Sequence, residues 1–342
     1  MNICKAFLSL WVVKLFYGKV YKKGIIMKKK LIVLCLICGI MFCGCGVEKT
    51  KEPQDDDRKI TFTDDLGRQV TVESPKSVVA LLGSYAHIWI LSGGTVHASA
   101  DDAWDDLNLD MPDDAVNLGN TKKLNLEKIL ASKPDFIIAS TNSSQHMEFK
   151  SIFESTNIPT AYFDVADFND YLRVLKICCD ITGREDLYEQ NGLKVKEEID
   201  NVKEKSRERM ADQKNAPTVL SLRASATFIR AKNSKGNVLG EMLEALGCVN
   251  IADVNDLLLE NLSLEYIMKE DPDYIFFVPQ GSDAKGTEEN IKKMFEENPI
   301  WSKLSAVKNN RVYYLDKELY GLKPNNRWGE AYRQIEDILE NG

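Results

Sequence analysis

The sequence predicts an α/β protein of two similar lobes joined by one long helix. Residues 124–138 (LNLEKILASKPDFII) and 262–276 (LSLEYIMKEDPDYIF) share seven of fifteen positions at an offset of 138 residues. This offset exceeds the roughly 20–50 residues of solenoid repeats, so it favours two lobes over a repeat array. Between the copies, residues 185–211 are rich in Glu, Lys and Arg and nearly free of strand formers, which predicts an exposed helix of about 40 Å.

Each copy has the pattern of a helix, a Pro-Asp turn and a buried strand. Asn125 and Ser263 are good N-caps, and apolar residues at helical spacing follow them. Pro134 and Pro272 end the two helices. The segments FIIAS and YIFFV come next as apolar, β-rich runs, which is typical of buried strands.

The rest of the chain alternates strands and helices. A β-hairpin is predicted for residues 60–74 (ITFTDDLGRQVTVES) and a buried strand for residues 77–82 (SVVALL). A helix is predicted for residues 86–94 (AHIWILSGG), and a helix, a turn and a strand for residues 149–165 (FKSIFESTNIPTAYFDV). Residues 101–123 resemble an acidic loop, and DFNDYLRVLKICCDITG is an amphipathic helix ending at Gly183. In the second half, a strand is predicted for residues 217–225 (PTVLSLRAS) and a helix for residues 237–247 (NVLGEMLEALG). A hairpin-like strand is predicted for residues 309–316 (NNRVYYLD) and the last helix for residues 326–341 (NRWGEAYRQIEDILEN). This alternation predicts a small parallel sheet in each lobe.

Residues 1–44 are expected to be a signal peptide. MKKKLIVLCLICGIMFCGC (27–45) places Cys45 where a lipoprotein signal has its acylated cysteine, although Phe42 and Cys43 depart from the usual pattern. A transmembrane anchor is the alternative, but residues 31–44 are 14 residues, fewer than the ~20 that a span needs. We interpret Met27 as the start and residues 1–26 as an upstream extension.

The remaining chain divides into a flexible tether (45–57), an N-terminal lobe (58–166), helices that include the bridge (167–212) and a C-terminal lobe (213–342). The signal peptide contains 8 of the 44 Lys and Arg residues and none of the 52 acidic residues, so the mature chain has a formal net charge of −16. Such an acidic surface argues against nucleic acid as a partner.

Motifs for catalysis or metal binding are absent from the sequence. It has no GxGxxG after a strand, no phosphate-binding GxxxxGK[ST] loop, no HExxH and no GxSxG, and no CxxC occurs after the predicted signal peptide. Cys178 and Cys179 are adjacent on a predicted helix and fit buried apolar positions. A secreted enzyme and a free-metal carrier with His87, His97 and His146 as ligands remain as alternatives from other functional classes.

Taken together, the order and spacing of these segments resemble the ABC-transporter substrate-binding proteins for ferric siderophores, haem or vitamin B12. The resemblance covers about residues 58–342, through ITFTDDLGRQVTV, VNLGNTKKLNLEKILASKPDFIIAS, ITGRE, LSLEYIMKEDPDYIFF and the tail NPIWSKLSAVKNNRVYYLD. It implies two Rossmann-like lobes joined by one long rigid helix, the class III periplasmic-binding-protein fold. It also implies a monomer without a resident cofactor, which delivers an iron chelate to a permease dimer with its ATPase.

In that family, a glutamate at the start of each repeated helix docks the protein onto the permease. Glu127 and Glu265 stand at the matching positions, so the resemblance implies this role for them. The alternative is that both glutamates only stabilise their own helices, because a carboxylate in the first turn of a helix is stabilised by the helix dipole.

Ligands of open α/β sheets bind beyond the carboxyl ends of the strands, which in two lobes face one cleft. Arginine and aromatic side chains expected there suit a large, oxygen-rich ligand. The predicted ligand contacts are Tyr85, Trp104, Arg223, Arg327 and Trp328. Trp328 could instead anchor the last helix in the core, Arg327 could pair with a surface acid, and His87 is expected to be packed. A ferric siderophore is the first choice of ligand, with haem or cobalamin as alternatives.

Overall fold

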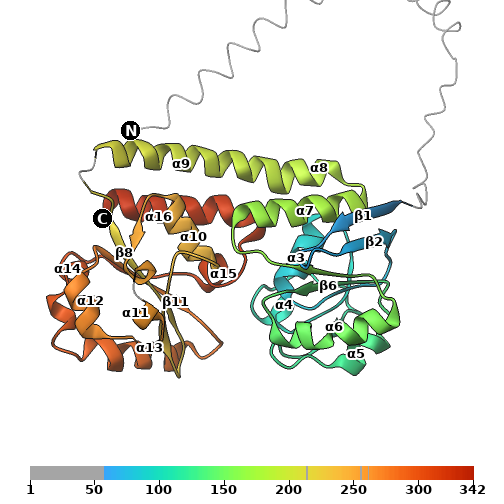
Figure 1. The fold of residues 1–342 in the computed structure, drawn as a ribbon, viewed down its shortest axis with the longest axis horizontal. Coiled ribbons are helices and arrows are strands. Elements are labelled where there is room, and N and C mark those ends of the chain that lie inside the picture. Colours follow the sequence, from blue (N-terminus) through green and yellow to red (C-terminus); the bar gives the residue numbers. More distant parts are fainter. Residues whose placement is uncertain (1–57, 213–214, 255, 261) are drawn as a thin grey trace, which may run out of the picture. The chain divides into compact units, whose positions relative to one another are not determined.

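The computed structural model describes residues 58–212, 215–254, 256–260 and 262–342 (Figure 1). The predicted signal peptide, the tether and Cys45 lie outside the described residues. None of the helices in the described ranges combines the length and the apolar character that crossing a bilayer requires.

The N-terminal lobe is built on a five-stranded sheet, as its apolar runs predict. All its neighbouring strands pair in parallel, in the order β5-β4-β3-β6-β7. The strands are β3 (Val78–Ala80), β4 (Val96–Ser99), β5 (Val116–Asn117), β6 (Phe136–Ser140) and β7 (Thr160–Phe163). The helices between them are α3 (Gly83–Leu91), α4 (Asp102–Asp105), α5 (Leu126–Ala131) and α6 (Ser144–Thr156). The expected acidic loop therefore contains the short helix α4 and the short strand β5.

The predicted hairpin is confirmed and closes onto this lobe. Strands β1 (Lys59–Thr63) and β2 (Gln69–Glu73) pair antiparallel. The buried carboxylate of Asp64 accepts hydrogen bonds from Arg68 Nη2 at 2.6 Å and from Tyr162 N at 3.2 Å. The hairpin is thereby tied to β7.

The C-terminal lobe has a second sheet of five strands. Four are parallel in the order β10-β8-β11-β12, and β9 pairs antiparallel with β8. The strands are β8 (Thr218–Ala224), β9 (Ile229–Lys232), β10 (Val249–Asn250), β11 (Tyr274–Pro279) and β12 (Val312–Tyr314). The expectation that NNRVYYLD is hairpin-like is wrong, because β12 follows a helical crossover and runs parallel to β11.

Helices and helical turns cover this second sheet. The α-helices are α10 (Val238–Ala245), α11 (Asp256–Glu260), α12 (Leu264–Glu270), α13 (Ala284–Ile291), α14 (Ser305–Lys308), α15 (Lys317–Tyr320) and α16 (Trp328–Asn341). The 3-10 turns are η2 (Ile251–Asp253), η4 (Trp301–Lys303) and η5 (Asn325–Arg327), and η3 (Lys292–Glu296) is a π-helical turn.

The two copies of the repeated pattern form the same structure in the two lobes. The Asn125 and Ser263 side chains cap α5 and α12 as predicted, by accepting from Lys128 N and Tyr266 N. The aspartate after each proline accepts main-chain hydrogen bonds at the start of the neighbouring strand. Asp135 accepts from Ser77 N at 2.9 Å, and Asp273 from Thr218 N at 2.8 Å. The Pro-Asp signature therefore ties adjacent strands together in each lobe.

A long helix joins the lobes, as the charged segment predicts. It consists of α8 (Glu185–Tyr188), a π-helical turn η1 (Glu189–Leu193) and α9 (Lys194–Asp212), and it follows α7 (Phe168–Thr182). It is not exposed all round, because Val195, Ile199 and Val202 form a buried stripe on α9. The η1 turn contacts α7, where a Cβ on Gly192 would approach Leu172 Cδ1 to 2.7 Å. A larger residue at this position would require the Leu172 side chain to shift.

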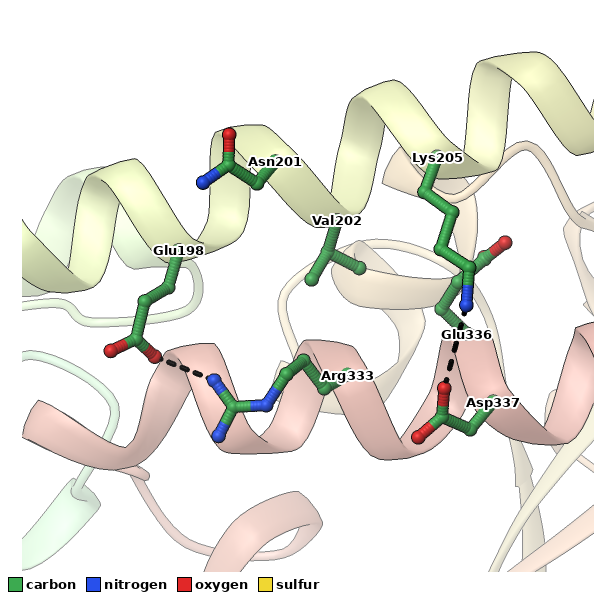
Figure 2. A pocket seen from close by; sticks show the side chains of 7 residues that line it. All are labelled: Glu198, Asn201, Val202, Lys205, Arg333, Glu336 and Asp337. Carbon is green, nitrogen blue, oxygen red and sulfur yellow. Dashed lines mark hydrogen bonds and ion pairs between the residues drawn. The ribbon is translucent and has the colours of Figure 1, made fainter.

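Helix α9 lies beside the last helix, α16 (Figure 1). Figure 2 shows the groove between them, where Glu198 pairs with Arg333 at 2.7 Å and Lys205 with Asp337 at 3.7 Å. Deeper in this interface, the buried Glu336 carboxylate accepts from Arg209 Nε at 2.8 Å and from Nη2 at 3.1 Å. The bridge is thus anchored to the C-terminal lobe by apolar contacts and a bidentate ion pair.

Candidate ligand-binding site

A cleft of about 290 Å³ opens between the lobes, beyond the carboxyl ends of the strands. Both lobes contribute to its walls. The N-terminal lobe provides Leu82, Ser84, Asp102, Asp106, Thr121, Asn142, Val165 and Ala166. The C-terminal lobe provides Arg223, Lys232, Gly236, Asn237, Val238, Gly321, Leu322 and Lys323.

The C-terminal wall has three cationic side chains, Arg223, Lys232 and Lys323. Arg223 lies on β8 and donates from Nη2 to the Gly321 carbonyl at 3.2 Å. Burial lowers the pKa of all three groups. Among the described residues, none of the three forms an ion pair. The wall therefore holds positive charge that is partly removed from water and in contact with no described carboxylate, although Asp164 and Asp102 partly offset the effect of burial on the pKa of Lys323.

The opposite wall has a carboxylate, Asp102, which is only 8% exposed and forms no ion pair with the other residues that the structure describes. It lies at the start of α4, and its Oδ1 accepts from Gly83 N, the first residue of α3, at 2.8 Å. A Cβ on Gly83 would come within 2.5 Å of Ala103 N, so glycine permits this close approach of the two helices. Burial, aided by the negative charges of Asp106 and Asp101, raises the pKa of Asp102 to about 6.

Two polar contacts join the lobes beside the cleft. Lys317 Nζ on α15 pairs with Asp106 Oδ1 at 2.6 Å and donates to the Gly281 carbonyl at 3.3 Å. The buried Asn325 donates from Nδ2 to the Ser84 carbonyl at 3.0 Å. These contacts fix Ser84 and Asp106, two residues of the N-terminal wall, relative to the C-terminal lobe.

Comparison with known proteins identifies this architecture. The model of the family described as "Periplasmic binding protein" matches residues 78–319. The chain belongs to the periplasmic binding protein family. The expected resemblance to the substrate-binding proteins of ABC transporters is thereby confirmed.

The similar proteins align over about two thirds or more of this chain. YhfQ of Bacillus subtilis, named as a candidate ABC transporter substrate-binding lipoprotein, is 26% identical over 87% of this chain and 93% of its own. The iron-uptake system-binding protein of the same organism is 27% identical over 84% and 90%. The high-affinity heme uptake system protein IsdE of Staphylococcus aureus is 24% identical over 66% and 75%.

Solved structures confirm the class III fold. The siderophore-binding protein BauB, solved with two acinetobactin molecules and ferric iron, has a TM-score of 0.64 and 20% identity, covering 82% of this chain and 97% of its own. IsdE of Staphylococcus aureus, solved with heme, has a TM-score of 0.60 and 20% identity, covering 77% and 98%.

Of the five predicted ligand contacts, Arg223 is the one that lines the cleft. Tyr85 and Trp328 are fully buried at 0% exposure, which corrects the expectation that they contact a ligand. Tyr85 Oη donates to the Phe163 carbonyl at 2.7 Å, beneath Lys323, whose Nζ lies 5.3 Å from the ring centre. Trp328 packs edge-on against Phe168 at 6.3 Å, so the alternative that it anchors the last helix in the core is supported.

The other two predicted contacts lie outside the lining of the cleft. Arg327 forms a bidentate pair with Glu330, at 2.8 and 3.0 Å, and bonds Glu318 at 3.0 Å, as its surface-acid alternative predicts. Trp104 is half-buried on α4 and does not contribute to the cleft walls. His87 is also half-buried, and burial, with the nearby Arg327 charge, lowers its pKa to about 4.

Four charged residues of the cleft, Asp102, Asp106, Lys232 and Lys323, were missed by sequence reasoning. Lys232 lies on β9, and the alternating apolar and polar residues of this strand (IRAK) were a usable signal in the sequence. Lys323 lies in the segment before η5, and Asp102 is one acid within a run of several. Only the tertiary fold distinguishes the buried Asp102 from its exposed neighbour Asp105.

Glu127 and Glu265 are both exposed, one in the first turn of α5 and the other in the first turn of α12. Among the described residues neither carboxylate makes an ion pair. Their isoleucine neighbours in the repeat, Ile129 and Ile267, are fully buried. Core packing and strand pairing therefore account for much of the repeated pattern, but not for the shared glutamates.

Replacing Asp102 with Asn should stabilise the protein at neutral pH. The folded-state pKa of about 6 exceeds the unfolded value near 4, so ionised Asp102 destabilises the fold progressively as pH rises through this window. We expect Asp102→Asn to raise the free energy of unfolding by about 2–3 kcal/mol at pH 7 and by little at pH 4. Urea unfolding at both pH values measures this, with the exposed Asp105→Asn as the control. An equal gain at both pH values would contradict the assignment.

Proposed function

We propose that this binding protein captures a ferric siderophore in the cleft and delivers it to an ABC permease, without chemical turnover. The observation that supports this most is the group of Arg223, Lys232 and Lys323 on one wall, none of which forms an ion pair with another described residue. Desolvating such charges costs free energy unless an anion neutralises them. An iron chelate with anionic oxygen donors would supply that charge, and arginine binds such oxygens through two parallel N–H groups.

The residues of the cleft favour a siderophore over haem or cobalamin. Haem iron is held by His, Met, Cys or Tyr side chains, and none of these is among the sixteen described residues that line the cleft. Aromatic side chains, which a cobalamin ligand was expected to need, are also missing from these sixteen. The iron-related names of the relatives are consistent with a ferric ligand.

Arg223 should be a main contributor to ligand affinity. We expect one or more ferric siderophores, among catecholate, hydroxamate and carboxylate types, to quench the tryptophan fluorescence of the full-length protein saturably. Arg223→Ala and Lys323→Ala should each weaken that binding about 10–100-fold, because hydrogen bonds to charged groups contribute about 1.5–3 kcal/mol.

The control for this titration is Arg207→Ala on α9, whose side chain is 72% exposed and pairs with Glu204. Haem and cobalamin are titrated alongside. Tight binding of either of these, with no response to any ferric siderophore, would refute the siderophore assignment.

We further propose that the protein is held on the outer side of the cell membrane by lipid on Cys45. The support is the segment 27–45 and the lipoprotein name of YhfQ. Cys45→Ala should abolish incorporation of labelled palmitate and release the protein from the membrane fraction. Unchanged labelling in this variant would contradict the proposal.

Glu127 and Glu265 are proposed to dock the protein onto the permease dimer. Two exposed carboxylates on equivalent helices of similar lobes, neither of them in an ion pair within the described part of the chain, suit a partner with two-fold symmetry. The double variant Glu127→Arg/Glu265→Arg should abolish uptake of the ferric ligand by cells and leave its affinity for the purified protein unchanged. Normal uptake by the double variant would end this proposal, and Glu288→Arg, at another exposed helical glutamate, controls for charge.

A further inference from the structure

The two walls of the cleft differ in charge. The cations come from the C-terminal lobe, and the carboxylates of Asp102 and Asp106 come from the N-terminal lobe. Asp106 is neutralised by Lys317 at 2.6 Å, whereas no cation pairs with Asp102 among the described residues. Asp102 is therefore the one cleft carboxylate, within the described part of the chain, whose charge is not balanced by an ion pair.

The structural role of Asp102 occupies only one of its oxygens. Oδ1 accepts from Gly83 N at the start of α3, in place of a side-chain cap from Leu82. Gly83 N is the only group of another described residue that donates a hydrogen bond to this carboxylate. Because an asparagine carbonyl could accept the same bond, helix capping alone does not require a charge at this position.

We infer that Asp102 is a specificity-determining residue, which accepts a hydrogen bond from an amine, amide or hydroxyl group of the bound chelate. This inference rests on the proposed function. The preferred ligand then presents its anionic iron centre to Arg223, Lys232 and Lys323, and a hydrogen-bond donor to the N-terminal wall.

Discrimination between ligands follows from the chemical group that each bound ligand places opposite the Asp102 carboxylate. A ligand with an ammonium or N–H group opposite Asp102 forms a charge-assisted hydrogen bond. A ligand with only acceptor oxygens there places lone pairs against a desolvated negative charge, and this repulsion lowers its affinity. Asp102 thus selects against fully anionic chelates, which the three cations alone would accept.

The test uses two ferric complexes that share a catecholate iron centre. One is made with dopamine, which has an ammonium tail, and the other with 3,4-dihydroxyphenylacetic acid, which has a carboxylate tail. The dissociation constants of both are measured for the wild-type protein, Asp102→Asn, Asp105→Asn and Arg223→Ala. Asp102→Asn retains an acceptor for Gly83 N, and Asp105→Asn makes the same charge change at an exposed position of the same helix.

The ratio of the two dissociation constants decides the outcome, because it cancels effects on the shared iron centre. We expect Asp102→Asn to shift the ratio at least about tenfold in favour of the carboxylate-tailed complex, and Asp105→Asn to shift it less than about twofold. An equal shift, or none, in the two variants overturns the role of Asp102 and leaves the proposed function intact. If neither complex binds the wild-type protein in a way that Arg223→Ala weakens, this inference is overturned, and the titration with ferric siderophores described above separately decides the proposed function.

Discussion

The structure depends on the packing of the bridging helix against the last helix. The buried ion pair of Arg209 and Glu336 lies within that interface, and Arg209 Nη2 also donates to Ser206 Oγ and to the Leu246 carbonyl, both at 3.1 Å. Loss of one partner would leave an unpaired buried charge, at a cost of about 3–5 kcal/mol. Because α16 belongs to the C-terminal lobe, this pair also orients the wall that holds the three cations of the cleft.

The lobes are alike in their scaffolds and unlike in the cleft. Asp135 and Asp273 perform the same task in both sheets, and the helices before them have equivalent caps. The residues that face the cleft share no such correspondence, since cations gather on one wall and carboxylates on the other. A duplicated framework can therefore keep a symmetric outer arrangement while the loops at its strand ends adapt to an asymmetric ligand.

Elements with strong local signals were predictable from the sequence. The capped helices, the Pro-Asp turns and the apolar strands depend on neighbours a few residues away, so periodicity and capping residues were sufficient to find them. The cleft residues were harder, because burial of Lys323 or Trp328 depends on segments far apart in the chain. Trp328, the first residue of the last helix, was predicted to contact a ligand, yet its ring fills the core against Phe168.

The π-helical turn allows a single helix to serve two lobes. On its N-terminal side, the Asn191 carbonyl accepts from Tyr171 Oη at 2.8 Å, and Asn191 Nδ2 donates to the Leu91 carbonyl at 2.8 Å. On its C-terminal side, Val195 and Ile199 begin the stripe that packs against α16. A π turn holds one residue more than an α turn, and each residue of an α-helix advances it by about 100°. The extra residue therefore rotates the face that packs against α16 by about 100° relative to the face that contacts the N-terminal lobe.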